Sequence, residues 1–429
     1  MLAICFSVSL ANAQAAFGQI FGIELHNNAM PASGGMGGAS VAQPQDLLSA
    51  INGNPATMSQ FGGTQFSFGG VWVEPTVNLD HTGGVLPGIG TFSGKSGTPG
   101  SVLGNIGVTR ELSDVGLPIT AGVALISASG IGVDYAAQPN SNNSAVTIQI
   151  LQLQPGLSIQ LTDRLAIGGS FGLGVALFDG FFVGSSKATP DYGTRGTFGV
   201  TFDPNPSTKI GFYYQTKESF NFENSIVLQP FIGPPSVPLD VRGALPPNIA
   251  LGFANSSLAN GRLLLATDLV YKFWEEAELF DALWTNQFIV QVGAQYTTQK
   301  GRKIRLGYTY AEETAVDVPG NVIAGITPPG AANAIQYGQG LIPNISPNRF
   351  SCGFGVPNVL PGVDLDIFGG GQFLSSATFG RTTASLETYF IGGGLTFRCG
   401  RGSGCKKSAH NEWCGTSQPQ CSSCEQDVE

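Results

Sequence analysis

The chain has 429 residues, and only 11% of them are Asp, Glu, Lys or Arg, against about 25% in a typical soluble domain. The net charge of −9 argues against a nucleic-acid partner. No apolar run reaches the roughly 20 residues that a membrane-spanning helix needs. The 61 glycines and the abundant small polar residues replace the missing charge. A membrane β-barrel, with an apolar outer face and a small, polar inner face, combines these features.

The start of the chain has the pattern of an export signal. It is apolar as far as Leu10 and then reads Ala11-Asn12-Ala13-Gln14-Ala15, which is an Ala-x-Ala cleavage site. Residues 1–15 are therefore assigned to a signal peptide. Because a basic n-region is missing, we expect the true start codon to lie upstream.

A glycine-rich segment, Ser33–Met58, precedes everything regular. It contains Gly35-Met36-Gly37-Gly38-Ala39 and, further on, Asn54-Pro55-Ala56. Small residues let the backbone turn tightly and approach other segments closely. Asp46–Ala50 suits one or two helical turns, which Asn54-Pro55 would end. We expect residues 16–62 to form a compact plug, called the hatch below.

From Thr64 onward, segments of about ten residues or more alternate between apolar and polar with period two. The strand candidates are 64–79, 103–111, 117–127, 146–162, 163–178, 193–203, 207–220, 237–255, 261–275, 284–299, 302–312, 347–357, 362–374 and 384–398. Their number is even, as a bacterial single-chain barrel requires. A soluble β-sandwich also alternates, but here the polar face is small and uncharged over many strands. The expected fold is all-β: a transmembrane antiparallel barrel of about 14 strands over residues 63–398, with the hatch in its lumen.

The faces and connections of these strands can be assigned as well. In 302–312, Ile304 and Leu306 are expected outside, and Arg305 and Thr309 inside. Every second connection is short, whereas most of the others are long. Short turns on the periplasmic side and longer external loops are typical of such barrels. This pattern predicts that the hatch and the C-terminus both lie on the periplasmic side.

Two of the long loops are unusually apolar. The third contains Phe181, Phe182 and Val183, and the fourth contains Phe222, Ile226, Leu228 and Phe231. Apolar clusters in loops are disfavoured unless they bind something or pack together. Two compatible interpretations stay open: the loops pack on each other as a lid, and a groove between them forms a hydrophobic capture site at the cell surface.

Nothing in the sequence has the pattern of an active site. The three histidines, His26, His81 and His410, are scattered over hatch, first loop and tail. An enzyme at the barrel rim would need a His beside a nucleophile, and His81 is the sole candidate there. The hatch glycines are no dinucleotide fingerprint, because no β-α-β unit surrounds them. We expect neither an enzyme nor a bound cofactor.

Residues 399–429 form a polar, Cys-rich tail. Its Cys414, Cys421, Cys424 and His410 suit either a zinc site or disulfides, and an oxidising periplasm favours disulfides.

A group of acidic residues lies at the outer ends of two predicted strands. It consists of Glu275, Glu276, Glu278, Glu312 and Glu313. This group suits either a cation or a solvated rim.

Several motifs together resemble those of the FadL/TodX family of outer-membrane channels for long-chain fatty acids and other hydrophobic compounds. They are the two hatch motifs, Asp268-x-x-Tyr271-x-x-Trp274, Arg305-x-Gly307-Tyr308, and Pro343-Asn344-Ile345-Ser346-Pro347-Asn348-Arg349-Phe350. The spacing between these blocks also agrees with the family. The resemblance implies a fourteen-stranded barrel closed by an N-terminal hatch.

The resemblance also implies a transport route. Substrate is captured by the third and fourth loops, passes to a pocket near the hatch, and leaves sideways through a gap where the third strand kinks. Small residues allow such a bend at Ser127, Ser129 and Gly130. In the hatch, the gating residues would be Gly35, Gly37, Asn54, Pro55 and Ala56. The sequence departs from the family after Phe397, where a barrel of this type normally ends.

The leading hypothesis is therefore passive uptake of fatty acids or other hydrophobic compounds, such as aromatics, by a monomer embedded in outer-membrane lipid. A channel for small polar solutes is the first alternative, because the Gly/Ser/Thr-rich lumen would suit it. A surface adhesin or assembly protein, with the tail as its active part, is the second.

Overall fold

The computed structural model describes residues 27–84, 86, 88–113, 116–179, 189–227, 238–322, 327, 330–345 and 347–399. The predicted signal peptide, residues 16–26 of the predicted hatch, and the tail beyond Cys399 lie outside this range. No helix among the described residues is long and apolar enough to cross a membrane.

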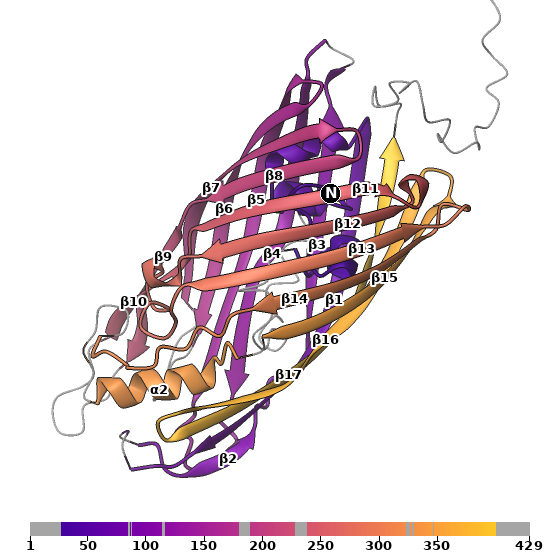
Figure 1. The fold of residues 1–429 in the computed structure, drawn as a ribbon. Helices are drawn as coiled ribbons and strands as arrows, with labels where there is room; N and C mark the ends of the chain where they lie inside the picture. Colours follow the sequence, from indigo (N-terminus) through magenta and orange to yellow (C-terminus); the bar gives the residue numbers. More distant parts are fainter. Residues whose placement is uncertain are drawn as a thin grey trace, which may run out of the picture.

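Long antiparallel strands wind around the molecule and close into a barrel (Figure 1). The main sheet has fifteen strands; one is the short β2 (Phe92–Lys95), which pairs only with the end of β1, and the other fourteen form the barrel. They are β1 (Thr64–His81), β3 (Ser101–Glu111), β4 (Ile119–Asp134), β5 (Ala145–Thr162), β6 (Leu165–Asp179), β7 (Thr189–Asn205), β8 (Thr208–Gln215), β11 (Asn248–Leu258), β12 (Leu263–Lys272), β13 (Gln287–Thr297), β14 (Lys303–Ala311), β15 (Asn348–Leu360), β16 (Val363–Phe379) and β17 (Thr382–Cys399). The predicted fold class is confirmed.

The barrel closes between its first and last strands. β1 pairs with β17 over its whole length, from Thr64 opposite Cys399 to His81 opposite Thr382. Closure leaves no free sheet edge at this seam, so the backbone groups of both strands are satisfied within the wall.

Side chains alternate across the wall as the sequence predicted. Leu306 is 63% exposed on the outside of the barrel, whereas its neighbour Arg305 is 1% exposed inside. The outer face carries large apolar side chains throughout, among them Phe171, Phe198 and Tyr389. The inner face carries Gly, Ser, Thr, Asn and Gln, which leaves room for the hatch.

Two predicted strands were wrong as single strands, and others differ at their ends, such as 117–127, which corresponds to β4 but runs on to Asp134. The segments 207–220 and 237–255 each split, because β9 (Glu218–Val227) and β10 (Pro238–Leu245) form a separate two-stranded hairpin outside the barrel sheet. Pro246 and Pro247 separate β10 from β11, and a proline has no N–H to donate to a ladder. The loop predicted at 375–383 is also shorter, since β16 and β17 run on to a turn at Gly380-Arg381, where Gly380 has a φ of 57°.

The two ends of the barrel differ. One end has most of the short connections and the end of β17; the other has β2, the β9–β10 hairpin, the tight β16–β17 turn and helix α2 (Ala331–Leu341) (Figure 1). The hatch lies inside the barrel and contains three short helices. They are η1 (Ser33–Met36), α1 (Leu47–Asn52) and η2 (Pro55–Gln60), and each contacts several wall strands.

Candidate functional site: hatch, wall and mouth

One carboxylate links two parts of the hatch. Asp46 caps α1 by accepting a hydrogen bond from the Ser49 N–H (2.8 Å), and its second oxygen accepts from the N–H groups of Ala32 (3.1 Å) and Ser33 (2.9 Å). The cap therefore ties α1 to the turn that leads into η1. A charged oxygen bound by several N–H groups is a strong link.

The glycine motif of the hatch contacts the wall directly through its backbone. Gly37 has a φ of 67°, its N–H donates to the Ser351 hydroxyl (3.0 Å), and its carbonyl accepts from the Thr309 hydroxyl (2.8 Å). A Cβ on Gly35 would lie 2.9 Å from the Cα of Gly353 in β15. Both predicted gating glycines thus lie where a side chain would push the hatch off the wall.

The Asn-Pro-Ala triplet contacts the opposite part of the wall. Asn54 caps η2 and donates to the carbonyls of Val41 (2.8 Å) and Val200 (3.0 Å). Pro55 occupies the first turn of η2, where its missing N–H costs nothing. The carbonyl of Ala56 accepts from the Ser158 hydroxyl (2.8 Å). The triplet therefore fixes the C-terminal half of the hatch to β5 and β7.

The wall is irregular at the predicted kink. In the β4–β5 pair, a bulge lies between Ser127 and Ser129. In the β3–β4 pair, the ladder stops at Asn105 opposite Ile126, although β4 continues to Asp134. A Cβ added at Gly130 would meet nothing within 4 Å. β4 therefore leaves β3 at the small residues that the sequence singled out.

A large apolar core fills the mouth of the barrel at the end with the long loops. This cap cluster joins side chains from strand ends, the β9–β10 hairpin and α2. Phe222 stacks on Phe178 at 5.1 Å between ring centroids, and Trp274 contacts Trp284 edge-on at 4.8 Å. Phe222 is thus buried, as the lid interpretation requires.

The side chains of the other predicted capture residues lie outside the described part of the structure. Phe181, Phe182, Val183, Leu228 and Phe231 lie outside the described residues, and of Ile226 only the backbone position in β9 is described.

His81 packs against the cap cluster. Its ring packs edge-on against Tyr337 at 4.8 Å, and its Nδ1 lies 2.8 Å from the Thr382 hydroxyl. Burial raises the pKa of Tyr337 to about 12, although its hydrogen bond to Ser144 opposes this shift. His81 and Tyr337 thus join the seam between β1 and β17 to α2.

The acidic residues at the strand ends do not gather into a metal site. Glu278 forms an ion pair with Lys217 (2.8 Å). In the part of the chain that the structure describes, no three His, Cys, Asp or Glu side chains are grouped so that they could hold a metal ion.

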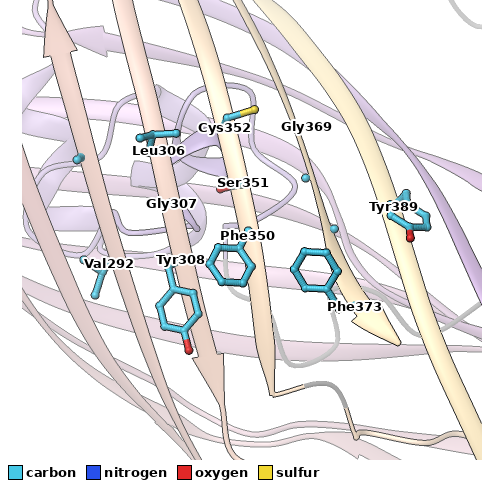
Figure 2. A pocket seen from close by; sticks show the side chains of 13 residues that line it. Val292, Leu306, Gly307, Tyr308, Phe350, Ser351, Cys352, Gly369, Phe373 and Tyr389 are labelled. Carbon is cyan, nitrogen blue, oxygen red and sulfur yellow. The ribbon is translucent and has the colours of Figure 1, made fainter. Parts of the chain in front are cut away.

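A groove of about 720 Å³ lies on the outer face of the barrel, across β13 to β17. Gly369 and Gly371 are among its lining residues, and Figure 2 shows the rings of Tyr308, Phe350 and Tyr389 on neighbouring strands along it. The rings of Tyr308 and Phe350 are 5.0 Å apart. The groove faces away from the lumen and contains none of the predicted site residues.

Comparison with known proteins identifies the fold. No protein-family model matches the sequence, and no curated protein is similar to it in sequence. Many solved structures match the chain, among them three that are similar in fold. The toluene transporter TodX of P. putida has a TM-score of 0.65 at 16% identity, over 88% of this chain and 99% of that one. A Pseudomonas aeruginosa FadL homologue has a TM-score of 0.64 at 15% sequence identity, over 86% of this chain and 98% of that one. The Ralstonia pickettii toluene transporter TbuX has a TM-score of 0.63 at 15% identity, over 88% of this chain and 100% of that one. The resemblance to the FadL/TodX type is therefore confirmed at the level of the fold.

Sequence reasoning missed the wall residues that hold the hatch. Asn105, Ser158, Thr309 and Ser351 all face the lumen and hydrogen-bond to the hatch backbone. Each is a polar residue at an inward position, but many lumen positions are polar, so the sequence alone does not single these out.

Proposed function

We propose that the chain is a passive uptake channel for hydrophobic compounds in a bacterial outer membrane, with the hatch and the C-terminus on the periplasmic side. The observation that carries the proposal is a closed barrel whose lumen holds a hydrogen-bonded hatch beside a bulge in the wall. The similar folds support it, since two of the matched structures are described as toluene transporters and one as a FadL homologue.

In the proposed route, the cap cluster and the apolar third and fourth loops receive the substrate, with Phe222 among the contacts. The hatch then shifts at Gly35, Gly37 and Asn54-Pro55-Ala56. The substrate leaves sideways past Ser127, Ser129 and Gly130 into the membrane. Lateral exit is favourable because an apolar chain that crosses a water-filled lumen would lose roughly 0.8 kcal/mol per CH₂ group. A monomer would suffice for this route, because one barrel contains every part of it.

The substrate is either a long-chain fatty acid or an aromatic hydrocarbon, and the test must include both. Cells that lack their own transporters would express the chain or a variant with Asn54, Pro55 and Ala56 changed to Gly. Uptake of labelled oleate or toluene that requires the intact triplet is the expected result. If the assembled barrel takes up neither compound, the proposal is wrong.

The second candidate function is a channel for small polar solutes. The polar side chains of the lumen wall favour it. The hatch that occupies the lumen argues against it. Liposome swelling separates the two functions: a hydrophobic-compound channel excludes sugars, whereas a polar-solute channel admits them. Deleting residues 399–429 addresses the adhesin hypothesis, which requires the tail and predicts a loss of adhesion without a loss of uptake.

A further inference from the structure

The hatch and the irregular part of the wall share one side chain, that of Asn105. This residue lies on β3, faces the lumen and is 4% exposed. Its Oδ1 accepts a hydrogen bond from the Ser127 N–H of β4 (3.0 Å). Its Nδ2 donates to the Ala29 carbonyl of the hatch (3.4 Å). One amide therefore contacts both the wall strand that bulges and the first part of the hatch.

Asn105 also marks the place where the ladder between β3 and β4 ends. Main-chain pairing runs from Glu111 opposite Thr120 to Asn105 opposite Ile126. At Ser127, side chains take over the pairing: the N–H bonds to Asn105, and the hydroxyl donates to the Gly104 carbonyl (2.9 Å). A rung made of side chains is released by a rotamer change, whereas a main-chain rung needs the strand to move.

Beyond this rung, the wall has a bounded window. On one side, residues 101–104 of β3 pair with β1 and not with β4. At the far end, the window is closed by the segment after β2: the Gly97 N–H donates to the Asp134 carbonyl (2.7 Å), and the Asp134 N–H donates to the Ser96 hydroxyl (3.0 Å). From Ser127 to Asp134, β4 rises seven residue steps, which is about 23 Å at the usual rise of a strand.

The residues at the near edge of the window, Ser127 to Gly130, are small, and two apolar cores meet there. Below the bulge, Ala124 and Ile126 of β4 pack against the hatch core of Leu47, Leu48 and Ile51. At the bulge, Ala128 packs against the cap cluster. The Ser129 hydroxyl is buried and has no hydrogen-bond partner in the described structure. A displacement of the hatch would thus be felt first at the edge of the window where Asn105 lies.

We propose that Asn105 is a positioning residue that couples the hatch to the window. With Ala29 in place, the amide is held so that its Oδ1 keeps the Ser127 N–H and the window stays narrow. When the hatch segment around Ala29 moves, the amide loses this partner, rotates and releases Ser127, and the window widens for a hydrophobic molecule. This coupling rests on the proposed lateral route and deepens it.

The test separates the coupling from the route. The native cysteines are changed to serine, and Gly130→Cys serves as a probe, because a Cβ there meets nothing within 4 Å. The labelling rate of Gly130→Cys by a membrane-soluble maleimide reports how open the window is. Asn105→Leu removes both hydrogen bonds. The labelling rate should rise about fivefold, because the bond to Ser127 that holds the window has the strength of one typical hydrogen bond. The matched control is Thr109→Val on the same strand, whose buried hydroxyl has no partner in the described structure; it should leave the rate unchanged.

A double-mutant cycle distinguishes coupling from mere weakening of the wall. The hatch variant with Asn54, Pro55 and Ala56 changed to Gly should also raise the labelling rate. If Asn105 acts through the hatch, the combined variant labels no faster than the faster single variant. The coupling is wrong if the two increases in labelling rate multiply in the combined variant. It is also wrong if Asn105→Leu labels no faster than Thr109→Val. Should Asn105→Leu fail to assemble, Asn105→Ser removes the same bonds with less bulk and is read in the same way.

The route itself is tested with a disulfide between Gly104→Cys and Ser127→Cys, which would lock the window. Uptake should fall in the oxidised protein and return with a reductant. If the locked protein takes up substrate normally, the lateral route of the proposed function is wrong. If the lock blocks uptake but the cycle shows no coupling, the route stands and only the role of Asn105 is wrong.

Discussion

The carboxylate of Asp268 in β12 accepts a hydrogen bond from the main-chain N–H of Ser40 in the hatch at 2.5 Å, and the same oxygen accepts one from the next N–H, that of Val41, at 2.9 Å. Asp268 is buried, so these N–H groups replace the water that the carboxylate has lost. The wall thus holds the middle of the hatch through its backbone. These two hydrogen bonds involve no side chain of the hatch.

This relationship predicts that Asp268→Ala loosens the hatch. It leaves two buried N–H groups without an acceptor, at a cost of about 1–3 kcal/mol each. Asp268→Asn keeps one oxygen and should have a smaller effect. In planar bilayers the parent should be closed to ions, whereas Asp268→Ala should show frequent openings. Asp203→Asn is the control, because the Asp203 carboxylate pairs with Lys209 of the wall. Equal conductance of all three variants would contradict the prediction.

Much of this architecture could be predicted from the sequence. Period-two alternation follows from strand geometry alone, so the faces of 302–312 and the number of barrel strands came out right. The hatch was predictable because Gly35 and Gly37 serve close backbone contacts, which need the absence of a side chain. A kink was predicted near Ser127, Ser129 and Gly130 from the family resemblance and the small residues; a bulge lies there, and an opening of the wall at this place stays a prediction.

Other features depend on long-range register and could not be predicted. The alternation of 237–255 looks continuous, yet Pro246 and Pro247 divide it, and only the pairing with β9 shows where the barrel strand begins. Asn105 is one of many inward polar residues. Its role depends on Ser127, which is 22 residues away in sequence, and on Ala29 of the hatch.

A second prediction concerns the close approach of hatch and wall at Gly307. A Cβ on Gly307 would lie 2.0 Å from the Gly37 nitrogen. Gly307→Ala should therefore displace the hatch and destabilise the folded protein by about 1–3 kcal/mol, as overpacking does. The control is Gly70→Ala on β1, where a Cβ meets nothing nearer than 3.4 Å. The measurement is the melting temperature in detergent. If the two variants melt at the same temperature, the hatch can shift to accept the added methyl group without loss of stability, and the prediction is wrong.

A third prediction compares two ion pairs of the same barrel. Arg305 and Asp366 are joined at 2.6 Å inside the wall, with the Arg305 side chain fully buried. Arg398 and Asp364 are joined at 2.9 Å, but the arginine side chain is 42% exposed. Arg305→Ala leaves a nearly buried carboxylate unpaired and should cost about 3–5 kcal/mol of unfolding free energy. Arg398→Ala should cost less than about 1 kcal/mol.

The measurement for this comparison is urea unfolding of the barrel in lipid vesicles. Asp366→Asn in the Arg305→Ala background should recover part of the loss, since it removes the unpaired charge. If the two arginine variants are equally stable, water reaches the Arg305 site and the buried pair does not support the wall.

The last prediction concerns which face of the barrel meets lipid. Cys352 lies on the outer face of β15, in the groove between Leu306 and Gly369, whereas Cys399 lies at the end of β17. If apolar outward side chains mark the lipid-facing surface, a fluorescent label on Cys352 sits among acyl chains and a label on Cys399 sits near the interface. With the remaining cysteines changed to serine, lipids brominated in mid-chain should quench the Cys352 label strongly and the Cys399 label weakly. Equal quenching, or quenching of the Cys352 label by aqueous iodide instead, would mean that this face of the barrel is not embedded in the membrane.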